Sequence, residues 1–229
     1  MQRNFAEKIL LVLAVVLLPL AASAQQRTPI KGWYTGAGLG IGAVYAQDDD
    51  DWFTDTTYGD PDLAWVVTGG YRFARYFALE ASYFDMGEPE YDDNLVDSRE
   101  FGIVDVDVDV DLTVTQLSAV GILPFRLGRN VRAEFFFRGG AAIWDGESEQ
   151  VIRSRTGDPT IRRTVDEDDI NFVFGFGGGL SFGDHWHLRL DYSNFAIEDD
   201  LLVLENDDDA YADTTTLQLH YRFGDSWKY

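Results

Sequence analysis

The chain has 229 residues, no Cys, and a formal net charge of −22, from 18 Lys and Arg set against 40 Asp and Glu. Such an acidic chain is a poor nucleic-acid binder, because phosphate neutralisation needs a basic surface. Hydrophobic residues make up 45% of the chain and aromatic residues 14%, which is too apolar for a disordered acidic protein. The lack of Cys excludes a disulfide scaffold, a thiolate metal site and a Cys nucleophile.

The first 24 residues have the pattern of a secretory signal peptide. Arg3 and Lys8 give a basic start, an apolar run follows over residues 9–20, and Ala22-Ser23-Ala24 forms a small-x-small cleavage site. The run is too short to span a bilayer as a helix, which takes about 20 residues. We therefore expect export of a mature chain, residues 25–229, that forms one domain.

Alternating apolar and polar residues predict β-strands through the rest of the chain. Residues 170–182 show this clearly, because Phe172, Phe174 and Phe176 alternate with Asn171 and Gly175. Eight segments have this period of two: residues 32–45, 63–73, 77–87, 106–125, 131–145, 169–182, 186–197 and 214–224. A β-bulge near residues 116–117 is a possible break in the alternation.

The connections between these segments alternate strictly in length. Three are short, at residues 74–76, 126–130 and 183–185, and four are long, at residues 46–62, 88–105, 146–168 and 196–213. Short turns at one end and long loops at the other are typical of outer-membrane barrels, with the turns in the periplasm and the loops outside the cell. The fold class predicted is all-β, an eight-stranded antiparallel up-and-down transmembrane β-barrel.

The two faces of the strands favour a membrane barrel over a soluble sandwich. One face is aromatic and aliphatic, as a lipid-facing wall requires, with aromatic residues near the strand ends. The other face carries too many ionisable groups for a soluble core, since burying an unpaired charge costs several kcal/mol or more. We assign a charged lumen to Arg72, Glu80, Asp107, Asp109, Asp111, Glu134, Arg138, Arg189, Asp191, His220 and Arg222.

Glycines alternate along the first and sixth strands, and they have two interpretations. In a narrow eight-stranded barrel they leave room for long side chains from neighbouring strands. The alternative is a phosphate-binding loop, because residues 38–43 match the loose pattern G-x-G-x-x-A. No helix is expected to follow that pattern, so the barrel interpretation is favoured.

Several short motifs resemble the OmpA-like transmembrane domain. These are Gly32-Trp33-Tyr34, the hairpin from Gly70-Tyr71-Arg72-Phe73 into Phe77-Ala78-Leu79-Glu80, and the closing Leu219-His220-Tyr221-Arg222-Phe223. OmpX-like, OmpW-like and opacity-type barrels have similar motifs. The resemblance implies insertion by the outer-membrane assembly machinery and contact with outer-membrane lipids and lipopolysaccharide. The chain departs from the family by running on through residues 224–229 and by lacking the peptidoglycan-binding domain of full-length OmpA proteins.

The lumen charges allow two interpretations. In the first, arginines pair with carboxylates and close the interior, because eight strands leave little free space. In the second, Asp107, Asp109 and Asp111 form a cation-attracting ladder in a narrow channel for ions or small solutes.

The acidic loops suggest a second hypothesis, in which function lies on the outer surface. Residues 46–62, 88–105, 146–168 and 196–213 together hold 28 acidic and 5 basic residues, so the acidic charge belongs to the loops. Loops on a rigid barrel commonly carry function, although a charge run is also an ordinary solvated surface. No cofactor is expected beyond weak Ca²⁺ or Mg²⁺ binding or partner contacts at Asp48, Asp49, Asp50, Asp51, Asp207, Asp208 and Asp209.

Catalysis is not expected. His187, Asp191 and Ser193 resemble a triad by residue type, but at about 3.3 Å per residue His187 and Asp191 lie roughly 13 Å apart. His185 and His187 form an H-x-H pair, which we interpret as solvated turn histidines rather than a metal site. The sequence thus predicts a non-enzymatic outer-membrane barrel for envelope integrity or surface contact; a channel is the second hypothesis and a lipid A-modifying enzyme the third.

Overall fold

The computed structural model describes residues 31–48, 56–58, 60–98, 102–127, 131–154, 160–197 and 208–223. The expected signal peptide and residues 224–229 lie outside these ranges. Every regular element in the described ranges is a strand, and they contain no helix long and apolar enough to cross a membrane.

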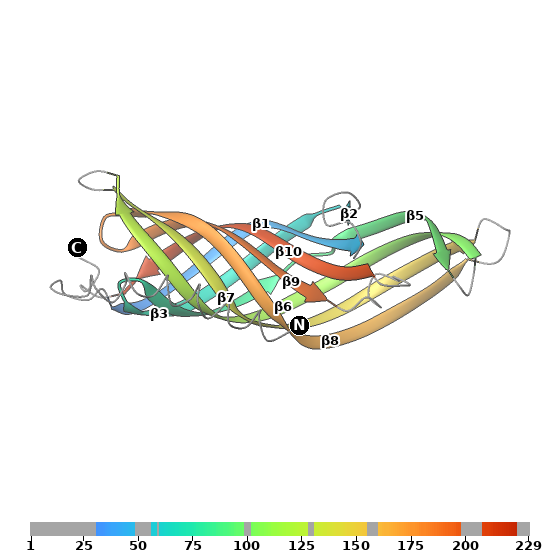
Figure 1. Cartoon of the computed structure of the whole chain (residues 1–229), viewed down its shortest axis with the longest axis horizontal. Helices are drawn as coiled ribbons and strands as arrows, with labels where there is room; N and C mark the ends of the chain where they lie inside the picture. The colour runs from blue at the N-terminus through green and yellow to red at the C-terminus, as the bar shows by residue number, and fades with distance from the viewer. Residues whose placement is uncertain are drawn as a thin grey trace, which may run out of the picture.

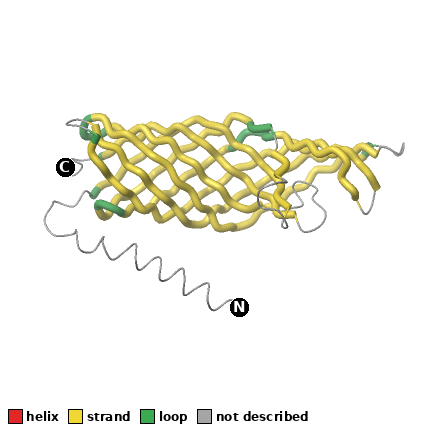
Figure 2. The backbone as a smooth tube through the Cα atoms, turned by 45° about the horizontal axis from the view of Figure 1, so that its top comes forward, coloured by secondary structure: helices red, strands yellow, loops and turns green. Residues whose placement is uncertain are grey.

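Eight antiparallel strands form a closed ring (Figures 1 and 2). Neighbouring strands pair along the chain, and β1 pairs with β10 from Tyr34 opposite Arg222 to Asp48 opposite Asp208, which closes the barrel. The predicted fold class is therefore confirmed. The ring strands are β1 (Gly32–Asp48), β3 (Asp62–Ala74), β4 (Phe77–Asp85), β6 (Gly102–Arg126), β7 (Val131–Ser154), β8 (Ile161–Phe182), β9 (Trp186–Ile197) and β10 (Asp208–Arg222).

The three short connections lie at one end of the barrel, called here the turn end, as predicted. The opposite, loop end differs from prediction, because much of the expected loop sequence is strand. Two extra strands, β2 (Thr56–Tyr58) and β5 (Glu90–Ser98), pair with β1 and β6 respectively. In addition, β6, β7 and β8 continue far into the segments predicted as loops.

These extensions form a sheet that projects beyond the rest of the barrel at the loop end, on the right of Figure 1. We define the projecting sheet as β5 with residues 102–113, 145–154 and 161–169. Strand continues here because the alternation of residues in this stretch never stops, so one face can still be buried. The charged residues that suggested loops form the solvated face of these strands.

The lipid-facing wall has the predicted composition. Leu39, Phe137 and Leu217 point outward and are more than half exposed, which is the position that lipid would cover in a membrane barrel. Aromatic pairs flank this apolar band: Trp33 packs against Tyr71 near the turn end, and Trp65 packs against Tyr83 nearer the loop end.

The inward-facing glycines make room for bulky neighbours, as predicted. A Cβ on Gly36 would collide with the ring of His220, and a Cβ on Gly179 would collide with the ring of His187. The predicted bulge near residues 116–117 is wrong: β6 keeps one register with both β4 and β7 through this stretch. The outward face of β6 is therefore the same face from end to end.

Candidate functional site

The turn-end half of the barrel interior holds a buried cluster of charges. Every member is at most 6% exposed. We call this the ionic cluster, and its members are Arg72, Glu80, Glu134, Arg138, Arg189, Asp191 and Arg222. All seven were predicted to line the lumen, and the structure confirms each of them.

Glu134 is the centre of one part of the cluster. Its carboxylate accepts hydrogen bonds from Arg72 at 2.8 Å and from Arg222 at 3.0 Å. Arg222 also donates to Ser181 Oγ at 2.8 Å, and Arg72 donates to the carbonyls of Ala74 and Arg75 in the turn. One carboxylate on β7 thus joins β3 and β10 across the barrel.

Glu80 and Asp191 form the second part with two arginines. Arg189 donates to both oxygens of Glu80, at 2.6 and 3.1 Å, and lies 2.7 Å from Asp191. Arg138 bonds Asp191 and lies 3.6 Å from Glu80. Two carboxylates and two guanidinium groups therefore balance each other and connect β4, β7 and β9.

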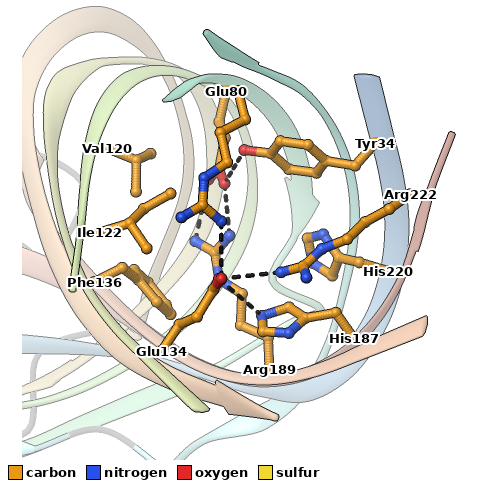
Figure 3. A pocket seen from close by; sticks show the side chains of 11 residues that line it. Tyr34, Glu80, Val120, Ile122, Glu134, Phe136, His187, Arg189, His220 and Arg222 are labelled. Atoms are coloured by element: carbon orange, nitrogen blue, oxygen red, sulfur yellow. Dashed lines mark hydrogen bonds and ion pairs between the residues drawn. The ribbon is translucent and has the colours of Figure 1, made fainter. Parts of the chain in front are cut away.

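Aromatic and imidazole groups surround these charges, as Figure 3 shows. Tyr34 donates to Glu80 at 2.6 Å, and the guanidinium of Arg189 stacks 3.7 Å from the centre of the Phe136 ring. His220, predicted in the lumen, is buried there and contacts Gln218 at 2.9 Å. The residues together line a cavity of about 30 Å³, which is room for one or two water molecules.

His187 corrects one sequence prediction. It is buried at 5% exposure, contacts Ser181 Oγ at 3.1 Å and lies 3.9 Å from Glu134. The interpretation as a solvated turn histidine is therefore wrong for His187. His185 does lie in the turn, where its ring stacks on Tyr221 and its Nδ1 meets the carbonyl of Arg222 at 2.8 Å.

Above the ionic cluster, toward the loop end, lies a layer of hydroxyl and amide groups. Thr68 and Ser82 share a hydrogen bond of 3.0 Å, and Gln218 donates to Thr216 at 2.9 Å. Gln116 donates to Ser118 at 2.8 Å in the same layer. These groups are buried and bonded to one another. Toward the loop end, the interior thus changes from charged to neutral polar groups.

Beyond this layer the interior becomes apolar, which differs from the prediction of a charged lumen. A buried cluster, called here the apolar core, fills the loop-end half of the barrel. Its largest members include Trp144, Phe84, Leu112, Met86 and Phe195, all at most 4% exposed. This half is built like a soluble β-barrel, with an apolar interior.

Asp107, Asp109 and Asp111 do not line the lumen, contrary to prediction. Asp109 and Asp111 are exposed on the outer face, and Asp107 is partly exposed there. The inward positions between them are Val108, Val110 and Leu112 of the apolar core. The reason is the unbroken register of β6: Leu117 and Leu123 face outward, so the odd-numbered residues from 107 to 125 do too.

The outer face of the projecting sheet carries carboxylates in rows. Asp111 lies opposite Glu147, which in turn lies opposite Asp166. Similarly, Asp109 lies opposite Glu149, and Asp145 opposite Asp168. All seven are exposed. We call these seven residues the acidic rows. Like charges directly opposite each other destabilise a sheet, so burial of the apolar core has to compensate.

The structure does not assemble the candidate triad. Asp191 is held by Arg138 and Arg189, His187 contacts Ser181, and the buried Ser193 hydroxyl has no hydrogen-bond partner.

The predicted acidic runs lie largely outside the described residues. This holds for Asp49, Asp50, Asp51 and Asp207. Asp48, Asp208 and Asp209 are described only as strand backbone, with Asp48 opposite Asp208. Within the described ranges, no group of three or more His, Asp or Glu is arranged to hold a metal ion.

The apolar outer wall, the closed ring of strands and the charged interior define a membrane-spanning β-barrel. The family described as "Outer membrane protein beta-barrel domain" matches residues 10–223. The chain belongs to this family and is an outer-membrane protein. In such barrels the short turns lie in the periplasm and the longer loops outside the cell.

Several solved outer-membrane proteins are similar to the chain at low identity. OprG from Pseudomonas aeruginosa is 12% identical with a TM-score of 0.48, covering 87% of this chain and 100% of its own. Ail, the attachment invasion locus protein of Yersinia pestis, is 14% identical with a TM-score of 0.43, covering 84% and 99%. Neisserial surface protein A is 13% identical with a TM-score of 0.42, covering 84% and 97%. No curated protein sequence matches the chain.

The ionic cluster gives a direct test of what holds the barrel closed. Glu134→Gln keeps the shape of the side chain but leaves two buried guanidinium groups without their carboxylate, and breaking a buried pair costs about 3–5 kcal/mol. We expect the urea-unfolding midpoint in liposomes, followed by tryptophan fluorescence, to fall accordingly. The control is Arg132→Gln, which removes a 3.8 Å contact to the more exposed Asp184 and should cost at most about 1 kcal/mol. Equal losses in both variants would contradict the assignment.

Proposed function

We propose that the barrel is a closed membrane anchor that displays an acidic β-sheet outside the cell for contact with cationic partners. The observation that carries this proposal is the set of acidic rows, whose carboxylates lie in cross-strand register on β6, β7 and β8. A solvated strand face needs only polar residues, and Ser or Thr would avoid the repulsion between opposite carboxylates. A surface of one sign attracts partners of the other sign and speeds their encounter.

The edge of the projecting sheet supports the same role. β8 pairs with β9 only from Val173 to Phe182, so within the described residues the backbone of residues 161–170 has no strand partner on that side. An open edge can accept an extended peptide as an extra strand. Charged side chains also protect such an edge from aggregation, but that explains charges at the edge and not those on the central strands β6 and β7.

Two other roles have weaker support. For divalent cations, the described residues offer no ready ligand cluster. For an enzyme, Asp191 and His187 are engaged by other residues and Ser193 Oγ bonds neither of them, and we propose that the protein is not catalytic. Ail has been solved with the heparin analogue sucrose octasulfate, but the acidic rows of this chain would repel a polyanion.

Neutralising the acidic rows tests the proposed role. The variant Asp111→Asn, Glu147→Gln, Asp166→Asn removes three opposed charges, each contributing at most about 1 kcal/mol to an exposed contact. We expect its affinity for a lysine-rich peptide, measured on protein in nanodiscs, to fall about tenfold. Folding should be intact, because repulsion within the sheet is relieved. The matched control, Asp60→Asn, Glu88→Gln, Asp184→Asn, makes the same charge change elsewhere and should bind like the original chain. Equal binding by all three proteins would refute the proposal.

A narrow channel is the alternative function, and the interior argues against it. The ionic cluster and the apolar core lie one above the other, and each would block a different stretch of the lumen. We expect planar-bilayer recordings of the purified protein to show no steady single-channel conductance, and Asp109→Asn to leave the recordings unchanged because Asp109 lies outside the barrel. Steady, cation-selective conductance would overturn the closed-barrel account.

A further inference from the structure

A polar patch interrupts the apolar outer wall at the loop end of β1, β9 and β10. We define the seam patch as Tyr45, Tyr192, Asn194, Tyr211 and Asp213. The strand alternation places all five on the outward face, in line with the lipid-facing Leu190 and Leu217. Asn194 is nevertheless only 4% exposed, so its neighbours cover this amide on the outside of the barrel.

The five side chains form two groups, which meet where Asn194 and Asp213 lie opposite each other on β9 and β10. Asn194 donates to Tyr45 Oη at 2.7 Å and to the carbonyl of Ala212 at 3.5 Å. The rings of Tyr45 and Tyr211 stack with centroids 5.5 Å apart. Tyr192 donates to Asp213 Oδ2 at 3.4 Å. Three phenols, an amide and a carboxylate therefore converge on the outer surface, across the seam that closes the barrel.

The seam patch lies at the height of the outer-leaflet headgroups. Phe223 directly follows β10 at the turn end of the apolar band, ten residues from Asp213. At about 3.4 Å per residue and a strand tilt of about 40°, this is roughly 25 Å of height, which is the height of the apolar band in such barrels. Asp213 is thus the first outward carboxylate on β10 above the acyl chains.

The chemistry of the patch favours a ligand that donates hydrogen bonds. The Asp213 carboxylate is partly buried, and the hydrogen bond it accepts from Tyr192 is long, at 3.4 Å, although a carboxylate offers about four acceptor positions. A carboxylate would repel a phosphate, and an acyl chain would leave it unsatisfied. Sugar hydroxyl and amide N–H groups satisfy it, and the tyrosine rings offer apolar faces together with polar tips.

We propose that the seam patch binds the saccharide headgroup of an outer-leaflet glycolipid. Sugar hydroxyl or amide groups donate to Asp213, and the ring lies against Tyr211. The proposal rests on the outer-membrane location and on the seam patch, and it is independent of the acidic rows.

The test compares two carboxylates at the same boundary on opposite walls. Asp213→Leu removes the proposed acceptor, whereas Asp145→Leu removes an outward carboxylate of β7 that opposes Asp168 and Thr113. Native mass spectrometry of full-length protein titrated with rough lipopolysaccharide measures the bound glycolipid. We expect about tenfold weaker binding for Asp213→Leu and unchanged binding for Asp145→Leu. Tyr211→Leu should also weaken binding.

Two further titrations identify the chemistry that is recognised. Dephosphorylated lipopolysaccharide should bind as well as the intact form. Phosphatidylethanolamine offers an ammonium group but no sugar, and its binding should be the same with and without Asp213. Binding that is lost with the phosphates, an equal effect of Asp213→Leu on phosphatidylethanolamine, or equal glycolipid affinity of the Asp213 and Asp145 variants would overturn the proposal. Urea unfolding of each variant in liposomes confirms that it is folded.

Discussion

The structure depends on a reversal of polarity along single strands. A strand in lipid must be apolar outside, because the bilayer core cannot solvate a charge or an open backbone group. Beyond the membrane the same strand meets water, so its apolar residues have to turn inward. Side chains alternate with a period of two, so a continuous strand keeps odd and even residues on fixed faces. The sequence therefore changes which of the two alternating sets is apolar. On β6 this change falls between Leu117, exposed to lipid, and Leu112, buried in the apolar core.

The reversal decides what the interior contains. In the membrane half the inward residues do not touch lipid, so they can be charged. The ionic cluster uses these positions to connect strands that are not neighbours. Glu134 on β7 reaches Arg72 on β3 and Arg222 on β10. Outside the membrane the apolar core replaces these charges and stabilises a sheet whose outer face is strongly acidic. The lipid-facing wall and the acidic sheet thus use the same strands.

The sequence predicts the membrane half of the barrel well and the loop-end half poorly, and both outcomes have the same cause. Around Arg72, Glu80 and Arg222, polar residues alternate with large apolar ones, and lipid contact sets the parity unambiguously. In residues 104–111 Val and Asp alternate perfectly, so either set can face inward. The assumption that the polar set lines the lumen then gives the wrong answer. Counting parity back from Leu123 and Leu117 would have placed Asp111 outside. The burial of His187 and the contact of Tyr34 with Glu80 depend on neighbours distant in sequence. The alternation within one strand does not predict such contacts.

The most direct measurement of the reversal is cysteine labelling along β6, since the chain has no Cys of its own. Single substitutions at Asp109, Asp111, Val110, Leu112, Leu117 and Leu123 are reacted with a membrane-impermeant maleimide on whole cells. We expect labelling at Asp109→Cys and Asp111→Cys only, because Val110 and Leu112 are buried and Leu117 and Leu123 face lipid. Labelling at Val110→Cys and Leu112→Cys, with the two aspartate positions protected, would contradict it and restore an acidic lumen.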